Sequence, residues 1–238
     1  MKNIVLSFSL LLSIFLVSCV SNDILEPSGN FEKKSRTIVE FTKLEISDAI
    51  EVEMTKADSC SLQLETYTNY HPYIYTDVSG STLRIYTSSS VDLNGSKIKV
   101  YLTCKELSQI KASGATKTLF LNKISAEQLN VFLSGASELK GEVNLKNLKL
   151  DISGASYINL AGITTDLNIE SSGASRVYLY PLVAENAILN ISGASVAEVN
   201  STKTLSVSAS DASKVYYKGN PTIAKSNLTG ASTLQKAD

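Results

Sequence analysis

Ser134-Gly135-Ala136-Ser137 is one copy of a four-residue motif that decides the fold of this chain, because the motif occurs seven times. Asp211 replaces the glycine once, and the copies begin at Ser113, Ser134, Ser153, Ser172, Ser192, Ser210 and Thr229. Successive copies are 18 to 21 residues apart. A repeat this short cannot bury its own apolar side chains, so it stacks on its neighbours and forms a solenoid.

Apolar and polar residues alternate on both sides of the motif. We count positions from the second motif residue, which is position zero. Position −4 is occupied by Ile110, Val131, Leu150, Ile169, Leu189 and Val207. Position −2 includes Leu133, Ile152, Ile191 and Leu228, and position +4 includes Leu139, Ile158, Val177, Val215 and Leu234. A period of two indicates strands that turn one face inward, so each repeat is a strand, a corner and a second strand.

The motif encodes the corner. Glycine permits a backbone conformation or a close approach that a side chain would prevent, and we expect the alanine to point into the tight bend. The flanking Ser and Thr hydroxyls can bond to backbone groups freed at the bend, or to the same residue of the next repeat. Asp211 favours a left-handed backbone at position zero, because Asp tolerates that region better than most residues.

We therefore predict an all-β, single-domain parallel β-helix, or solenoid, over residues 37–238. Its coils should lie about 4.8 Å apart and turn in the right-handed sense that is usual for connections between parallel strands. Residues 37–106 contain strands but no copy of the motif, so we expect irregular first coils there that cap the repeated coils of 107–238. The last coil should also need a cap.

The first residues resemble a bacterial lipoprotein signal peptide. Lys2 precedes an apolar run over 4–17, and Leu16-Val17-Ser18-Cys19 looks like a lipobox. This predicts removal of residues 1–18 and an outer-membrane lipid anchor on Cys19, on the periplasmic side or at the cell surface. An ordinary secretory signal is the alternative, and either one implies export. Residues 19–36 have no apolar periodicity and are predicted to be a tether.

Composition excludes several partners. The chain has 238 residues, is 43% hydrophobic and 19% charged, and carries a formal net charge of −1. Removing Lys2 with the signal peptide leaves −2 (−1 minus the one positive charge). No basic surface for nucleic acid or an anionic membrane is expected, so the lipid anchor would be the only contact with a membrane.

Several segments together resemble a known family. Phe41, Leu44-Glu45-Ile46 and Ile50-Glu51-Val52 open the pattern, Gly80–Ile85 and Ile98–Leu102 follow, and the serial Ser-Gly-Ala-Ser corners complete it. These features resemble the head GIN domain of auto-transporter adhesins over about residues 38 to 235. The resemblance implies a β-helical domain of the kind found in exported lipoproteins of Gram-negative bacteria. Thr103-Cys104 departs from it, where similar proteins often carry a proline.

Candidate chemistry is sparse. Cys60 and Cys104 could form a disulfide in an exported protein, or remain as two buried thiols. His71 is the only histidine and no Cys-x-x-Cys occurs, so we expect neither a metal nor a cofactor. Asp151 and Glu170, both at position −3 of successive coils, could act as the carboxylate pair of a retaining glycosidase at about 5 Å. The alternative is a solvated polar column, which continues with Asn190, Ser208 and Asn227.

The outward positions after the corner form a second candidate site. Positions +3, +5 and +7 collect a set that we call the tyrosine strip: Glu138, Lys140, Tyr157, Asn159, Arg176, Tyr178, Tyr180, Lys214 and Tyr216. Tyr157, Arg176, Tyr178, Tyr180, Lys214 and Tyr216 are the predicted binding residues, for a glycan or for an envelope or host protein. The alternative is that tyrosine simply favours exposed strands. We thus expect an exported, non-catalytic binding lipoprotein, with a carbohydrate-active enzyme or a structural spacer as alternatives.

Overall fold

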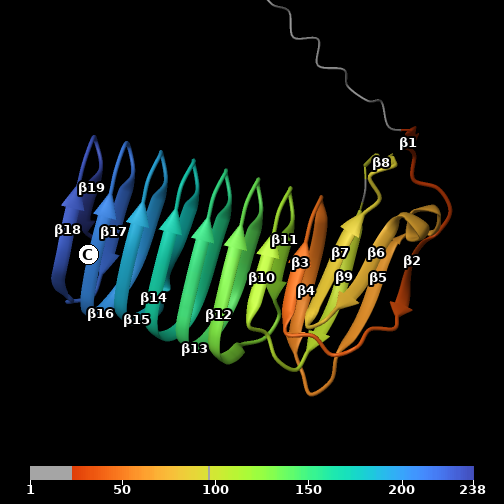
Figure 1. Ribbon diagram of the computed structural model, residues 1–238, viewed down its shortest axis with the longest axis horizontal. Helices are drawn as coiled ribbons and strands as arrows, with labels where there is room; N and C mark the ends of the chain where they lie inside the picture. Colours follow the sequence, from red (N-terminus) through yellow and green to blue (C-terminus); the bar gives the residue numbers. More distant parts are fainter. Residues whose placement is uncertain (1–22, 96) are drawn as a thin grey trace, which may run out of the picture.

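Stacked parallel strands form an elongated solenoid in the computed structural model, which describes residues 23–95 and 97–238 (Figure 1). Each strand of the repeated region pairs in parallel with the equivalent strand one repeat later, which confirms the predicted fold class. The strands are β10 (Gln109–Ala112), β11 (Lys117–Phe120), β12 (Ile124–Leu133), β13 (Glu138–Ile152), β14 (Tyr157–Ser171), β15 (Arg176–Ile191), β16 (Val196–Ala209), β17 (Lys214–Lys218), β18 (Thr222–Leu228) and β19 (Thr233–Lys236).

The core follows the predicted alternation. The residues at position −4, from Ile110 to Val207, are fully buried, and so are the residues at position +4 from Leu139 to Val215. Each contacts the equivalent side chain of the neighbouring coil, because the register advances by one whole repeat. Apolar burial of this kind is the main stabilising contribution to a stack of short repeats.

The corner is left-handed at every copy of the motif. The glycines at position zero have φ between +67° and +76°, and Asp211 has φ +60°. The N–H of Ala155 donates to the carbonyl oxygen of Gly135 at 2.7 Å, and the neighbouring coils repeat this bond. A Cβ placed on Gly154 would lie 2.4 Å from the same oxygen. Position zero therefore favours glycine for two reasons, its φ and the closeness of the preceding coil, and Asp211 fills it where the bond from Ala212 to Gly193 is longer, at 3.0 Å.

One detail of the predicted corner is wrong. The alanines at position +1 are exposed, and the Ser or Thr at position +2 points inward instead. Ser175, for example, is fully buried and donates its hydroxyl to the carbonyl oxygen of Ser172 at 2.8 Å. The same local bond is made by Ser137, Ser213 and Ser232, and it lets these inward residues be polar, whereas the hydroxyls of Thr116 and Ser156 are buried without a partner.

An additional corner precedes the seven that the motif indicates. Asp48 has φ +71°, and its carbonyl oxygen accepts the N–H of Ala115 at 2.8 Å, as a position-zero residue does elsewhere. It joins β3 (Lys43–Ile46) to β4 (Ile50–Lys56), which pair in parallel with β10 and β11. The regular column of corners thus begins within the segment predicted to be irregular.

The cap is built in an order that differs from the chain order. Two strands, β7 (Thr82–Thr87) and β9 (Ile98–Cys104), stack in parallel on the outer side of β3 and β4. Antiparallel strands then close the end: β5 (Ser61–Tyr67) pairs with β9, and β6 (Ile74–Ser79) pairs with β7. A 3-10 helix, η1 (Thr68–Tyr73), carries the buried Tyr70. The hydroxyl of Tyr70 donates to the carbonyl oxygen of Asn94, directly after the strand β8 (Val91–Leu93).

The predicted tether over residues 19–36 is wrong for its described part. Strand β1 (Asp23–Leu25) pairs with β8, and β2 (Phe31–Arg36) pairs antiparallel with β5 over six residues. Arg36 donates to the carbonyl oxygen of His71 at 2.8 Å. Backbone pairing and polar contacts, rather than apolar burial, hold the charged strand β2 in place. Its sequence therefore has no apolar periodicity from which a strand could be predicted. Residues 1–22, with the predicted signal peptide and Cys19, lie outside the described residues.

The far end of the column carries no cap within residues 97–238. Strand β19 pairs with β17, and β18 pairs with β16, which leaves their other edges free. Ile223 and Leu228 of the last coil are 39% and 40% exposed, whereas Leu205 and Ala209 one coil earlier are buried.

Within residues 23–95 and 97–238, no helix is long and apolar enough to span a membrane.

Candidate functional site

The tyrosine strip is one continuous surface on the strands that follow the corner. Tyr157 is the register partner of Arg176, and Asn159 is the partner of Tyr178. The rings of Tyr157 and Tyr178 are 5.4 Å apart between centroids, and the ammonium of Lys140 lies 5.2 Å from the centroid of Tyr157. The predicted strip residues of these three coils are therefore neighbours.

Glu198 belongs to the strip although the sequence analysis did not include it. Its register partners are Tyr178 on one side and Tyr216 on the other. Burial raises the pKa of Glu198, and Lys218 partly opposes that effect. Burial also raises the pKa of Tyr180, with further contributions from Glu198 and Tyr216. The middle of the strip is thus a half-buried cluster of three tyrosines around one carboxylate.

Glu198 can be found by counting positions from the corner, as for the other strip residues. It lies five residues after Gly193, which is the position of Tyr178 and Tyr216 in their own coils. Arg176 and Lys214 are the exposed members of the predicted binding set, whereas Tyr157, Tyr178, Tyr180 and Tyr216 are half-buried. The strip therefore combines half-buried tyrosines with three exposed cations, Lys140, Arg176 and Lys214.

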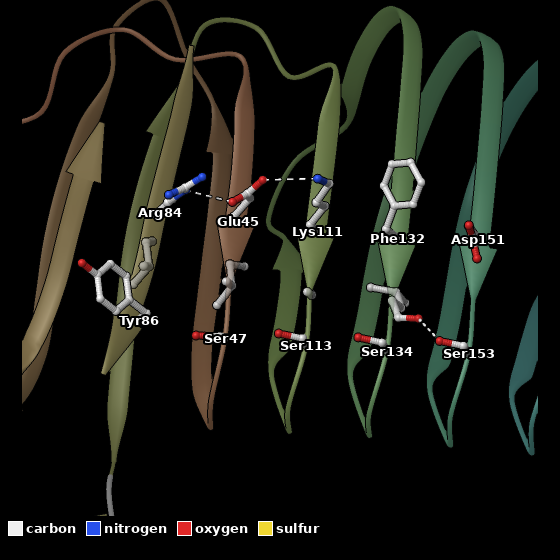
Figure 2. A pocket seen from close by; sticks show the side chains of 14 residues that line it. Glu45, Ser47, Arg84, Tyr86, Lys111, Ser113, Phe132, Ser134, Asp151 and Ser153 are labelled. Carbon is white, nitrogen blue, oxygen red and sulfur yellow. Dashed lines mark hydrogen bonds and ion pairs between the residues drawn. The ribbon is translucent and has the colours of Figure 1, made fainter. Parts of the chain in front are cut away.

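A second site, which sequence reasoning missed, is hollowed into the strands before the corner. This axial groove has a volume of about 600 Å³. Figure 2 shows two rows of side chains along it. One row is Arg84, Glu45, Lys111, Phe132 and Asp151, and the other is Tyr86, Ser47, Ser113, Ser134 and Ser153. The rows come from β7, β3, β10, β12 and β13, which are adjacent coils of the stack.

The charged groups of the axial groove are held in place by one another. Glu45 accepts from Arg84 at 3.0 Å and lies 3.4 Å from the ammonium of Lys111 (Figure 2). Lys111 also lies 5.9 Å from the ring centroid of Phe132. At the capped end, Tyr86 donates its hydroxyl to Asp77 at 2.9 Å and stacks on Tyr75 at 5.1 Å. The groove is therefore ordered along its length, with an aromatic wall at one end.

The two aspartate corners show what the corner donors can bind. One carboxylate oxygen of Asp48 accepts from the hydroxyl of Ser47 at 3.0 Å and from the N–H of Thr87 at 2.8 Å. Likewise, one oxygen of Asp211 accepts from the hydroxyl of Ser210 at 3.0 Å and from the N–H of Gly193 at 3.1 Å. The serine at position −1 and the corner N–H of the preceding coil thus form a paired donor for an oxygen atom.

The predicted carboxylate pair is adjacent but engaged. Asp151 and Glu170 are register partners on β13 and β14, as the repeat predicts. However, Glu170 lies 3.3 Å from the ammonium of Lys149, and its side chain is 47% exposed. The next residue of the column is Asn190, which lines the same shallow depression. This arrangement fits a solvated polar column better than a pair of catalytic carboxyl groups, one of which must be protonated.

The remaining candidates lie in the cap. Cys60 and Cys104 are free thiols, and burial raises the pKa of Cys104 to about 11. Burial also lowers the pKa of His71, and so do the nearby charges of Lys34 and Arg36. Within residues 23–95 and 97–238, no three side chains of His, Cys, Asp or Glu gather in a way that could hold a metal ion.

Comparisons with known proteins agree with this fold. The family model described as "Putative auto-transporter adhesin, head GIN domain" matches residues 40–221. A crystal structure of a "putative adhesin" from Bacteroides fragilis has a TM-score of 0.82 at 20% identity, and the match covers 90% of this chain and 100% of that one. A "putative lipid binding protein" from Parabacteroides distasonis has a TM-score of 0.74 at 20% identity, covering 91% and 100%. No curated protein matches the chain significantly.

Proposed function

This chain belongs to the family described as "Putative auto-transporter adhesin, head GIN domain", and from that premise we propose that it is an exported, non-catalytic binding protein of the cell envelope. The adhesin-like family supports export or surface display. We further propose that Cys19 carries the lipid anchor, as its lipobox-like context indicates. The solenoid then holds its long faces away from the membrane.

The tyrosine strip is the proposed contact surface, and its partner is a protein. The strip is rich in tyrosine and carries Arg176, and these two residue types are enriched at protein interfaces. The observation that carries the proposal is the cluster of Tyr178, Tyr180 and Tyr216 around the half-buried Glu198. Large aromatic side chains that are already ordered lose little conformational freedom on binding, so they are typical interaction hot spots.

A bead adhesion assay tests this proposal. Beads coated with the purified protein are incubated with host cells and with outer-membrane fragments, and the bound fraction is counted. We expect Tyr178→Ala with Tyr216→Ala to lower the bound fraction by about tenfold or more, because two hot-spot side chains are removed. The melting temperature should fall only slightly, since both side chains are half-buried on the outer face and their loss removes only cross-strand contacts.

The control replaces exposed apolar residues that lie outside the strip. Ile163 and Ile188 are 55% and 52% exposed, so Ile163→Ala with Ile188→Ala removes a similar amount of apolar surface. This control should adhere like the wild type. The proposal fails if the tyrosine variant adheres as well as the control, or if wild-type beads adhere no better than uncoated ones.

A further inference from the structure

The axial groove repeats its polar groups once per coil. Ser47, Ser113, Ser134 and Ser153 stand at the same position of successive coils, about 4.8 Å apart. That distance is close to the length that one sugar ring adds to an extended polysaccharide. An extended peptide advances by only about 3.4 Å per residue, so its groups would fall out of step with the coils. The spacing favours a sugar chain that runs along the solenoid axis.

The charges of the groove balance. Arg84 and Lys111 supply two positive charges, and Glu45 and Asp151 supply two negative ones (Figure 2). A polyanion or a polycation would therefore gain little from this surface. A hydroxyl group, in contrast, can donate to the carboxylates and accept from the ammonium and serine groups, so an uncharged polyhydroxyl chain can satisfy both kinds of partner.

The corner donors add a repeated contact for an oxygen atom. At Asp48 and Asp211 the chain supplies its own carboxylate to the serine hydroxyl and the preceding corner N–H. Glycine has no side chain that could do so. Along the groove, the hydroxyl of Ser134 with the N–H of Gly114 offers the same paired donor to a ligand oxygen. One coil on, the hydroxyl of Ser153 donates to the carbonyl oxygen of Leu133 at 3.4 Å, and it reaches a ligand only by exchanging that long bond.

We propose that the axial groove binds one extended chain of a neutral polysaccharide, with about one sugar unit per coil. Phe132, which stands between Lys111 and Asp151 in its row, supplies the apolar ring on which the C–H face of a sugar ring packs (Figure 2). Tyr86 closes the capped end, and Asp151 accepts hydroxyl groups at the other. The groove lies on the opposite side of the corner column from the tyrosine strip, so this site is separate from the proposed protein contact.

Calorimetric titration with neutral linear oligosaccharides tests the proposal. Cello-, xylo- and manno-oligosaccharides of increasing length are titrated into the purified protein, with oligogalacturonates as the charged comparison. Affinity for at least one neutral series should rise with length and level off at about four or five units, because Tyr86 and Ser153 are four coils, or about 19 Å, apart. The oligogalacturonates should bind more weakly at each length.

Two variants assign the binding to the groove. Phe132→Ala should weaken the best neutral ligand by about tenfold or more, and Phe132→Leu, which keeps the apolar volume, should still weaken it severalfold. Tyr178→Ala with Tyr216→Ala should leave this affinity unchanged, so that failure here and failure of the proposed protein contact are distinguishable. The proposal is overturned if no neutral series binds, if affinity does not depend on length, if the oligogalacturonates bind more tightly, or if Phe132→Leu folds and binds like the wild type.

Discussion

Gly154→Ala tests why the corners require glycine. Gly154 has φ +71°, where an alanine costs about 1 to 2 kcal/mol. Its new Cβ would also lie 2.4 Å from the carbonyl oxygen of Gly135, which accepts the N–H of Ala155 at 2.7 Å. Overpacking against backbone adds about 1 to 3 kcal/mol. After a gain of about 0.5 kcal/mol from the stiffer unfolded chain, we expect a loss of about 3 kcal/mol.

Two matched glycines separate the contributions. Gly80 has φ +58° with no atom within 4 Å of an added Cβ, so Gly80→Ala should cost only about 1 kcal/mol. Gly230 has φ +67°, but its added Cβ would lie 2.9 Å from the carbonyl oxygen of Asp211, so Gly230→Ala should fall in between. The Cβ of Asp211 faces the preceding corner, Gly193, and there the bond from the N–H of Ala212 to the carbonyl oxygen of Gly193 is longer, at 3.0 Å.

Urea denaturation followed by circular dichroism measures the three variants. The unfolding free energies should decrease in the order Gly80→Ala, Gly230→Ala, Gly154→Ala. A domain of this kind is stable by about 5 to 15 kcal/mol, so a loss of about 3 kcal/mol shifts the midpoint clearly. If Gly154→Ala costs no more than Gly80→Ala, the close approach between coils is not what selects glycine, and the argument from the corner geometry is refuted.

Three further predictions concern the proposed anchor and the cap. Metabolic labelling with a fatty acid should mark the wild type and not Cys19→Ala; an unlabelled wild type would exclude the anchor. Iodoacetamide at pH 8 should modify the half-exposed Cys60 and spare Cys104, whose pKa burial raises to about 11. Mass spectrometry of the labelled native protein locates the modified thiol, and modification of Cys104 before Cys60 would contradict the prediction. Because the pKa of His71 is lowered by folding, the unfolded chain binds its proton more readily, so the unfolding free energy should fall as the pH drops below about 6.5. His71→Gln should make the unfolding free energy depend less on pH in this range. An equal pH dependence in the variant would show that His71 does not cause it.

The repeated part of the fold could be predicted from the sequence because each coil contacts only its neighbours. A period near 20 residues fixes which residues stack, and a period of two fixes which face inward. Tyr157, Arg176 and Tyr178 were placed side by side on this basis, and the register agrees. Asp48 was missed, although Ser47-Asp48-Ala49 repeats the sequence Ser210-Asp211-Ala212. This three-residue match lacks the glycine that marks most of the corners, so it is a weak signal in the sequence.

The coil can be read from the residues alone: its length, its inward residues and its left-handed glycine corner. The order of the cap, with β7 and β9 outside β3 and β4, and β2 paired with β5, follows from the folded structure and not from any pattern in the chain. Backbone hydrogen bonds make these pairings, and such bonds carry no residue signature that distinguishes one partner strand from another. The axial groove depends on that order, because Arg84 pairs with Glu45, and Tyr86 lines the same groove, only when β7 stacks beside β3, against the order of the chain.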